Sequence, residues 1–370
     1  MVAATPPYTT ATSMSRAGSP SPLSQPPSPP TTHNRRPHDA NRDSAENANT
    51  PLTPSPRYVG WVAEAVAPLE GFIDESVDPR DFYCDLREIA HTENGSVLAA
   101  ALVPDAPIHR LKLPSPVKTR DARDIANGRR VLVAVKCLAL LPGENARVER
   151  LRRECELLRG LWCEQMVGMD ALYVDLVEDA LWIRSELMEG RLTDMIRRIP
   201  DGLRLQEPPV MARLASDMLH ALVYLQGYSI AHGDLCSENL FINGKGVLKV
   251  AGFSNAVRVT PLATDVVAPE VHDSFKFDVW CVGAIVWEMA EAPPPPFDPW
   301  PVARLPPVNK LYPAWLQDFL NECFVPAVIR PSPKELLEAI WIQRACGRPI
   351  VKRLVSSFRS IEATRPASVT

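Results

Sequence analysis

The chain has 370 residues, 46% of them hydrophobic, and a formal net charge of −4. This length allows a two-lobed domain with tails, and the hydrophobic content is enough for a large core. The charge balance gives no reason to expect nucleic acid or a membrane surface as a partner. The sequence has no apolar run of about 20 residues and no signal-peptide pattern, so we expect neither a transmembrane helix nor secretion. The eight scattered cysteines form no Cys-x-x-Cys pair and predict reduced thiols, which favours a cytoplasmic protein.

Residues 1–57 are rich in Pro, Ser, Thr and Asn and poor in large apolar side chains. Such a segment buries too little surface to offset its chain entropy, so we expect it to be disordered. Several Ser-Pro and Thr-Pro pairs, among them Ser19-Pro20 and Thr53-Pro54, would suit proline-directed phosphorylation. A plain linker is the alternative interpretation.

Order is expected from Tyr58 onward, beginning with a lead-in segment over residues 58–80. Residues 131–138 carry Val and Leu around a single Lys136 and predict a buried strand. The preceding stretch, residues 103–130, is polar and contains prolines, so we expect a surface insertion between two strands. Apolar residues at helical spacing then predict a helix over residues 145–160.

Helices dominate the rest of the pattern. The same spacing predicts a helix over residues 211–225, and residues 279–289 are apolar almost all round, which is typical of a buried helix. Because strands come first and helices later, the chain is predicted to be α+β with two segregated parts. Near the C-terminus, Ile350, Leu354, Phe358 and Ile361 predict an amphipathic helix. We expect this helix to dock on the helical part of the chain that precedes it, and partner binding is the alternative.

A series of short motifs follows the order found in protein kinases. Each motif alone is weak, and their order and spacing carry the signal. They are Val-Ala-Val-Lys136, a helix with Glu154, His232-Gly-Asp-Leu-Cys-Ser-Glu-Asn239, Gly252-Phe-Ser254, Ala268-Pro-Glu270, Asp278-Val-Trp280 and Arg330-Pro331.

With these motifs, residues 81–342 resemble a protein kinase. The resemblance is strongest to the PAK branch of Ser/Thr kinases, in a fungal-type form with degenerate motifs. It implies a bilobal α+β fold, with a small β-rich N-lobe over residues 81–184 and a large helical C-lobe over residues 189–342. Residues 343–370 would form a C-terminal helix and tail. The GTPase-binding motif of PAK proteins is not visible before residue 58.

The resemblance also implies roles for individual residues. Asp234 matches the catalytic base, and Asn239 matches a magnesium ligand. Lys136 and Glu154 match the pair that orients the ATP phosphates, with a purely structural buried ion pair as the alternative. Residues implied to line the nucleotide site are Gly95, Val97, Ala134, Lys136, Glu186, Met188 and Phe241. Phe241 would lie beneath adenine, where its ring either fills part of the pocket or packs aside.

Several groups that handle phosphate and metal in kinases are replaced here. The magnesium-binding aspartate is Gly252, and the lysine two residues after the catalytic aspartate is Cys236. The arginine before that aspartate is Gly233, and two glycines of the phosphate loop are Ala90 and Thr92. Loss of one preorganised charge of this kind typically costs on the order of a hundred- to a thousandfold in rate. The segment between residues 254 and 268 is also short for the family.

Groups that brace a kinase fold persist, while groups that hold triphosphate and metal are mostly gone. We therefore expect a pseudokinase that acts as a signalling scaffold or regulator, and a working Ser/Thr protein kinase is the alternative. ATP binding stays open, and Mg²⁺ binding is not expected because Asn239 alone is a weak ligand for a hard cation. The expected partners are proteins, with an active kinase as one candidate. The bracing residues are His232, Phe253, Glu270, Asp278, Arg330 and the pair formed by Lys136 and Glu154.

Overall fold

The computed structural model describes most of the chain after residue 57. The tail expected to be disordered, residues 1–57, lies outside the described residues, as do the side chains of residues 269–273 and 361–364. The described ranges are 58–92, 95–143, 145–198, 208–259, 269–291, 308–310 and 312–364.

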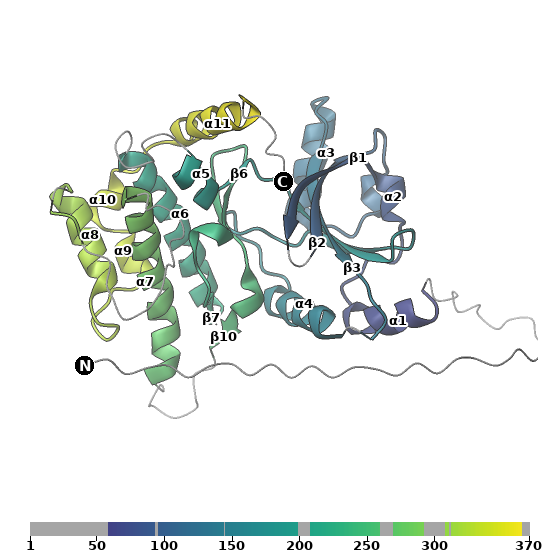
Figure 1. Cartoon of the computed structure of the whole chain (residues 1–370), viewed down its shortest axis with the longest axis horizontal. Helices are drawn as coiled ribbons and strands as arrows, with labels where there is room; N and C mark the ends of the chain where they lie inside the picture. The colour runs from purple at the N-terminus through teal and green to yellow at the C-terminus, as the bar shows by residue number, and fades with distance from the viewer. Residues whose placement is uncertain are drawn as a thin grey trace, which may run out of the picture. The chain divides into compact units, whose positions relative to one another are not determined.

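The N-lobe is built on a five-stranded antiparallel sheet in the order β1-β2-β3-β5-β4 (Figure 1). The buried strand predicted around Lys136 is confirmed as β3. The strands are β1 (Tyr83–Thr92), β2 (Gly95–Leu102), β3 (Leu132–Ala139), β4 (Ala171–Asp175) and β5 (Ala180–Glu186). The helices are α1 (Trp61–Val66), η1 (Ala67–Leu69), α2 (Pro79–Phe82), η2 (Ile108–Arg110), α3 (Ser115–Ala126) and α4 (Asn145–Leu158).

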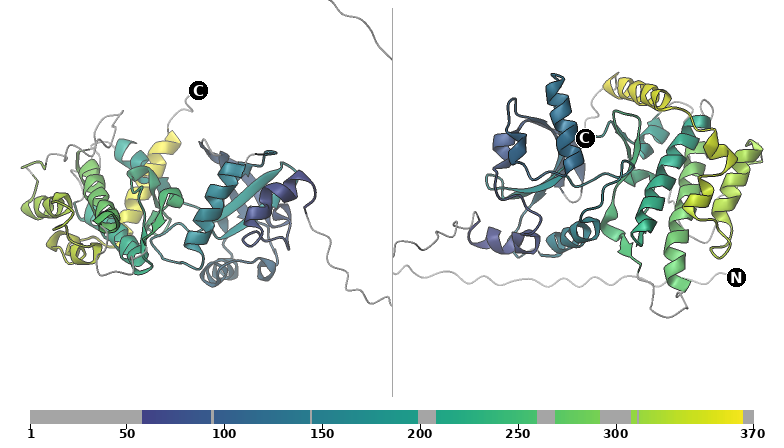
Figure 2. Two further views of the ribbon diagram at one scale, coloured as in Figure 1. Left: turned by 90° about the horizontal axis from the view of Figure 1, so that it is seen from below. Right: turned by 180° about the vertical axis from the view of Figure 1, so that it is seen from behind.

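Both faces of this sheet are buried because successive side chains of a strand point to opposite sides. On β5, Leu181 and Ile183 pack with α4 and α1, while Trp182 packs with the insertion on the other face. Helices α3 and α4 accordingly lie on opposite sides of the sheet in all views (Figure 1 and Figure 2). The lead-in segment is therefore part of the lobe's core, with Val62 and Leu69 buried against α4 and the sheet.

Residues 103–130 lie between β2 and β3, as predicted for an insertion between two strands, but the prediction that the insertion stays on the surface is wrong. Its residues Leu111, Leu113 and Val117 are buried in the core of the N-lobe. On α3, Asp121 is fully buried and forms an ion pair with Arg184, which is itself fully buried on β5. A charged side chain is costly to bury without a partner, so the insertion supplies the counterion that Arg184 needs.

The C-lobe is mainly helical and contains two small sheets, β6-β8-β9 and β7-β10. The predicted helix over residues 211–225 is confirmed as α6, and the helix predicted over residues 279–289 is longer, because α7 starts ten residues earlier in a less apolar stretch. The helices are α5 (Leu192–Arg198), α6 (Pro208–Gly227), η3 (Ser237–Asn239), η4 (Phe253–Asn255), α7 (Pro269–Glu291), α8 (Ala314–Phe324), α9 (Pro333–Leu336), α10 (Ile340–Gln343) and α11 (Arg348–Thr364). The strands are β6 (Gly190–Arg191), β7 (Ile230–Ala231), β8 (Leu240–Ile242), β9 (Leu248–Val250) and β10 (Val257–Arg258).

The predicted C-terminal helix is α11, and it packs on the C-lobe as expected (Figure 1). Its buried stripe is Val351, Val355 and Phe358, whereas Ile350 and Leu354 are only half-buried. The predicted face is thus confirmed at Phe358 and, in part, at Ile350 and Leu354, which pack against the C-lobe core, while Val351 and Val355 extend it to one side; the side chain of Ile361 lies outside the described residues. No helix in the part of the chain that the structure describes has the length and hydropathy of a membrane span.

Candidate active site

The loop that carries the catalytic motif lies between β7 and β8 and is held from below by Asp278 on α7. The Asp278 carboxylate accepts hydrogen bonds from the backbone N–H groups of His232 (2.8 Å) and Gly233 (2.9 Å). Burial raises the pKa of Asp278 to about 6, against the opposing effect of these two donors. The expected bracing role of Asp278 therefore has a direct geometric basis.

His232 ties this loop to the segment around Gly252. Its Nε2 lies 3.0 Å from the carbonyl oxygen of Ala251, which can only accept, so Nε2 carries the proton. Nδ1 is then free to accept the backbone N–H of Asp234 at 3.3 Å. Burial lowers the pKa of His232, and its ring meets Phe253 edge-on with centroids 5.0 Å apart. A neutral imidazole thus connects the two motifs.

The burial of Asp278 leads to a pH-dependent prediction. Its folded-state pKa of about 6 lies above an unfolded value of about 3.9. The stability that it contributes is therefore complete below pH of about 4 and is lost as pH rises through about 6. Replacing it by asparagine removes this titration. The gap in unfolding free energy between wild type and Asp278→Asn should be larger at pH 4.5 than at pH 7.5 by about 2 kcal/mol.

Urea denaturation at several pH values measures this gap. Asp194→Asn, at a partly exposed carboxylate on α5, controls for general effects of charge. If the difference in unfolding free energy between wild type and Asp278→Asn stays constant with pH, the raised pKa of Asp278 is contradicted.

Asp234, the residue matching the catalytic base, is held by two amide groups. Asn239 Nδ2 donates to the Asp234 backbone carbonyl (2.9 Å) and to its carboxylate (3.3 Å). Asn255 Nδ2 donates to the same carboxylate oxygen at 3.2 Å. The contribution of Asn255 was not predicted, because it lies one residue beyond the Gly-Phe-Ser motif and has no counterpart in the quoted kinase pattern. The amide groups of Asn239 and Asn255 thus fix the orientation of the Asp234 carboxylate.

Gly252 adopts a left-handed conformation, with φ +81°. A Cβ atom added there would lie 2.5 to 2.7 Å from three atoms of the Asn239 amide, closer than real contacts allow. The amide therefore fills the space beside the Cα atom at the position where kinases have their metal-binding aspartate.

These residues do not fit a magnesium ion. Asp234 supplies the carboxylate beside Gly252. Asn239, the predicted metal ligand, is neutral, and its Nδ2 donates hydrogen bonds to Asp234. Among the residues that the structure describes, no group of three or more His, Cys, Asp or Glu side chains could hold a metal. Since Mg²⁺ prefers several oxygen ligands in a strict octahedron, we derive no chemical step through it.

Lys136 and Glu154 face each other without direct contact. No N···O distance within 4.0 Å joins them in the described structure, so the predicted buried ion pair is not formed. Burial raises the pKa of Glu154, while the charge of Lys136 and the backbone N–H of Phe253 act in the opposite direction. The backbone of the Gly-Phe-Ser turn thus stabilises the charged form of the Glu154 carboxylate, which can therefore be buried without a close lysine.

The residues implied for the nucleotide site come from strands that meet in register. Val97 pairs with Lys136 across β2 and β3, and Ala134 pairs with Ser185 across β3 and β5. At Gly95 an added Cβ would lie 2.0 Å from the carbonyl oxygen of Cys137, so glycine is required there for backbone packing. Met188 lies in the half-buried segment between β5 and β6.

Phe241 lies on β8, opposite Arg191 of β6. The Arg191 guanidinium is over the phenyl ring, 5.5 Å from its centroid, a distance typical of a cation–π contact. Arg191 was not predicted as part of the site, because a single arginine outside any motif gives no sequence signal of function. This contact holds the phenyl ring against Arg191.

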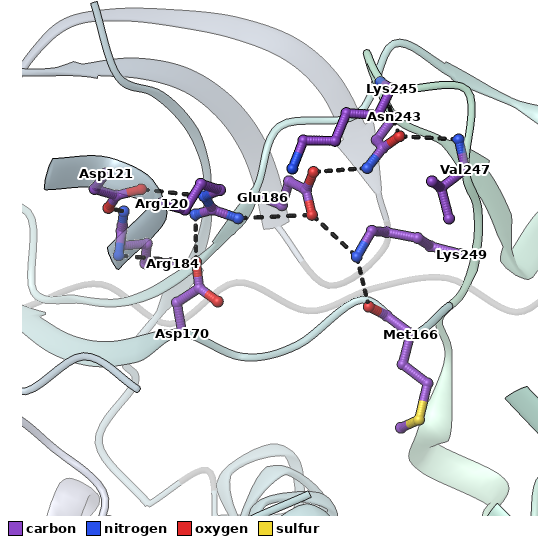
Figure 3. Close-up of polar contacts among 10 residues, drawn as sticks. All are labelled: Arg120, Asp121, Met166, Asp170, Arg184, Glu186, Asn243, Lys245, Val247 and Lys249. Atoms are coloured by element: carbon purple, nitrogen blue, oxygen red, sulfur yellow. Dashed lines mark hydrogen bonds and ion pairs between the residues drawn. The ribbon is translucent and has the colours of Figure 1, made fainter. Parts of the chain in front are cut away.

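Glu186 sends its side chain to the other side of the sheet from Lys136. It alternates with Ser185, which shares a face with Lys136 through the β3–β5 register. Its carboxylate contacts Lys249 Nζ (3.1 Å), Asn243 Nδ2 (2.8 Å) and Arg120 (3.6 Å), as Figure 3 shows. Burial raises the pKa of Glu186, but these partners outweigh it and the pKa is lowered overall. These contacts involve the Glu186 side chain, whereas the resemblance to kinases implies that its backbone groups face adenine.

The protein kinase domain model matches residues 122–342, which is more than half of the chain. The chain belongs to the protein kinase family. Its resemblance to the PAK branch is also supported by individual relatives.

Serine/threonine-protein kinase pak-2 of Caenorhabditis elegans is 25% identical over 300 residues, which cover 74% of this chain and 51% of that protein. Human serine/threonine-protein kinase PAK 4 is 27% identical over 252 residues, covering 64% and 40%. Mitogen-activated protein kinase kinase kinase 17 of Arabidopsis thaliana is 31% identical over 236 residues, covering 59% and 61%. The chain thus spans about half the length of these relatives.

Parts of the kinase motifs lie outside the residues that the structure describes. The short segment before Ala268 falls outside the described residues, and so does the side chain of Glu270, the predicted partner of Arg330. Arg330 itself donates to the backbone carbonyls of Val325 (2.8 Å) and Lys276 (2.5 Å). These contacts hold the start of α7 against the loop that follows α8.

Proposed function

We propose that this kinase-family protein is a pseudokinase that acts as a scaffold or regulator for protein partners in the cytoplasm. The observation that carries this proposal is the arrangement of Gly252, Asn239 and Asp234. A glycine stands at the metal position, the Asn239 amide packs against it, and the one remaining carboxylate is hydrogen-bonded by amides. The eight cysteines are free in the structure, which suits a reducing compartment.

The contrast between the two kinds of kinase residue supports the same proposal. Asp278, His232 and Phe253 form a connected, buried set that holds the catalytic loop. The groups that would hold phosphate and metal lack the charge needed for that task, as at Gly252 and Cys236. A domain built in this way keeps the shape of a kinase surface for protein contacts.

Thermal unfolding with ATP, with and without Mg²⁺, tests the proposal. A ligand at about a hundred times its dissociation constant adds roughly 2.7 kcal/mol to the unfolding free energy. We expect no increase that depends on Mg²⁺, because the site lacks metal ligands. Lys136→Ala is the control that shows whether any shift with ATP alone arises in the cleft. A clear Mg²⁺-dependent shift would refute the proposal.

A working Ser/Thr kinase is the second candidate. Three observations support it: Asn239 hydrogen-bonds to the Asp234 carboxylate, Lys136 lies on β3 opposite Val97, and the Glu154 carboxylate interacts with the backbone of Phe253. Transfer of radiolabel from ATP to a protein hydroxyl, abolished by Asp234→Ala, would establish this activity in place of the scaffold role.

A further inference from the structure

A groove of about 1370 Å³ lies beside the end of β5, on the face of the sheet to which the Glu186 side chain points. Its walls come from four places: the lead-in segment, the insertion, the loop between α4 and β4, and the β8–β9 hairpin. Two of these four, the lead-in and much of the insertion, precede the part of the chain matched by the protein kinase domain model. The groove is therefore built in part by residues that precede the matched domain.

The floor of the groove carries a network of ion pairs around Glu186. Arg120 and Lys249 both contact Glu186, and Lys245 extends toward the same residue without an ion pair within 4.0 Å (Figure 3). Burial raises the pKa of Glu186, but Lys249, Asn243 and Arg120 outweigh it, so the pKa is lowered and the carboxylate is charged. Arg120 also pairs with Asp121 (3.1 Å) and Asp170 (3.5 Å), so the cation of this group that is left available to a second acidic group is Lys245.

Arg123 adds to this charge at the rim. Its side chain and that of Lys245 are exposed, and within the described ranges neither makes an ion pair. Both residues line the groove. An acidic side chain of a bound partner could therefore reach either of them without breaking an existing contact.

Apolar surface accompanies these cations. Trp162 lines the groove with 53% of its surface exposed, and Phe72 and Leu161 are half-buried beside it. Arg159 stacks on Phe72 with its guanidinium carbon 4.3 Å from the ring centroid. Large aromatic and arginine side chains in a concave surface are typical anchors of protein interfaces.

The combination identifies the class of partner. Glu70 and Glu164 also line the groove and would repel a dense polyanion, so nucleic acid and anionic membranes fit less well. We propose that the groove is a docking site for an extended segment of a partner protein in which pairs of acidic residues alternate with single bulky apolar ones. The acidic residues would meet Arg123 and Lys245, and an apolar residue would cover Trp162. This proposal rests on the scaffold role proposed above and names its partner chemistry.

Fluorescence anisotropy with a labelled peptide of Glu-Glu-Leu repeats tests the proposal on the full chain. We expect saturable binding that weakens as salt rises. The double variant Arg123→Glu plus Lys245→Glu should weaken binding by roughly tenfold or more. The matched control is Lys334→Glu plus Arg353→Glu, which makes the same charge change at exposed residues outside the groove and should leave binding unchanged. Hydrogen exchange should show peptide protection over residues 112–123 and 159–170.

Several results would overturn the docking proposal. These are absence of binding, equal weakening in both double variants, or equal binding of Gln-Gln-Leu repeats. Binding of phosphatidylserine vesicles but not of the peptide would assign the surface to lipid instead. The peptide assay contains no nucleotide, so its result stands apart from the ATP and Mg²⁺ test of the pseudokinase proposal.

Discussion

Replacing Asp121 by alanine is expected to lower the free energy of unfolding by about 3–5 kcal/mol. Asp121 and Arg184 are both fully buried, and the variant would leave the guanidinium without its closest counterion. Asp170 is the remaining carboxylate near Arg184, at 3.8 Å, and burial already raises the pKa of Asp170. A loss of this size is a large part of the roughly 5–15 kcal/mol that stabilises an ordinary domain.

Urea denaturation of matched variants isolates the effect of burial. Asp124→Ala removes a carboxylate from the same helix whose partner, Arg129, is 68% exposed, and should cost less than about 1 kcal/mol. The pair Asp121→Leu with Arg184→Met should recover much of the loss, because it removes both buried charges together. Equal stability of Asp121→Ala and Asp124→Ala would show that α3 is only a surface addition.

This dependence on Asp121 shows why the insertion was misjudged from the sequence. Polar residues and prolines over residues 103–130 indicate a surface insertion, and nothing local reveals that Asp121 meets Arg184, 63 positions further on. The strand around Lys136 and the helix α6 were predictable because their apolar periodicity is local. The family was predictable because its motifs have fixed order, and the kinase domain match confirms it.

Within the site, sequence identified the altered positions but not their consequences. The absence of a carboxylate at Gly252 is plain from the motif, yet the packing of Asn239 against it depends on three-dimensional contact. The Lys136–Glu154 ion pair was inferred from the family pattern, whereas the two side chains stay beyond contact distance here. The partners of Glu186 come from three separate elements, and no short motif links them.

Gly252→Ala is expected to destabilise the protein by about 2–5 kcal/mol, from two sources. A non-glycine residue in a left-handed conformation costs roughly 1–2 kcal/mol, and overpacking a filled site costs about 1–3 kcal/mol. The added Cβ would meet the Asn239 amide at 2.5 Å. In a double-mutant cycle, Asn239→Ala should relieve the overpacking but not the backbone cost. We therefore expect a favourable coupling of about 1–2 kcal/mol, measured by urea denaturation.

Gly252→Asp then separates a chemical defect from a steric one. If the position lacked only a carboxylate, this variant would gain Mg²⁺-dependent stabilisation by ATP. The contact with Asn239 predicts instead that Gly252→Asp loses stability as Gly252→Ala does and gains no metal dependence, because the new side chain displaces the amide that orients Asp234. A Mg²⁺-dependent rise in the melting temperature of Gly252→Asp would show that Asn239 yields easily and that the loss of function lies in one missing charge.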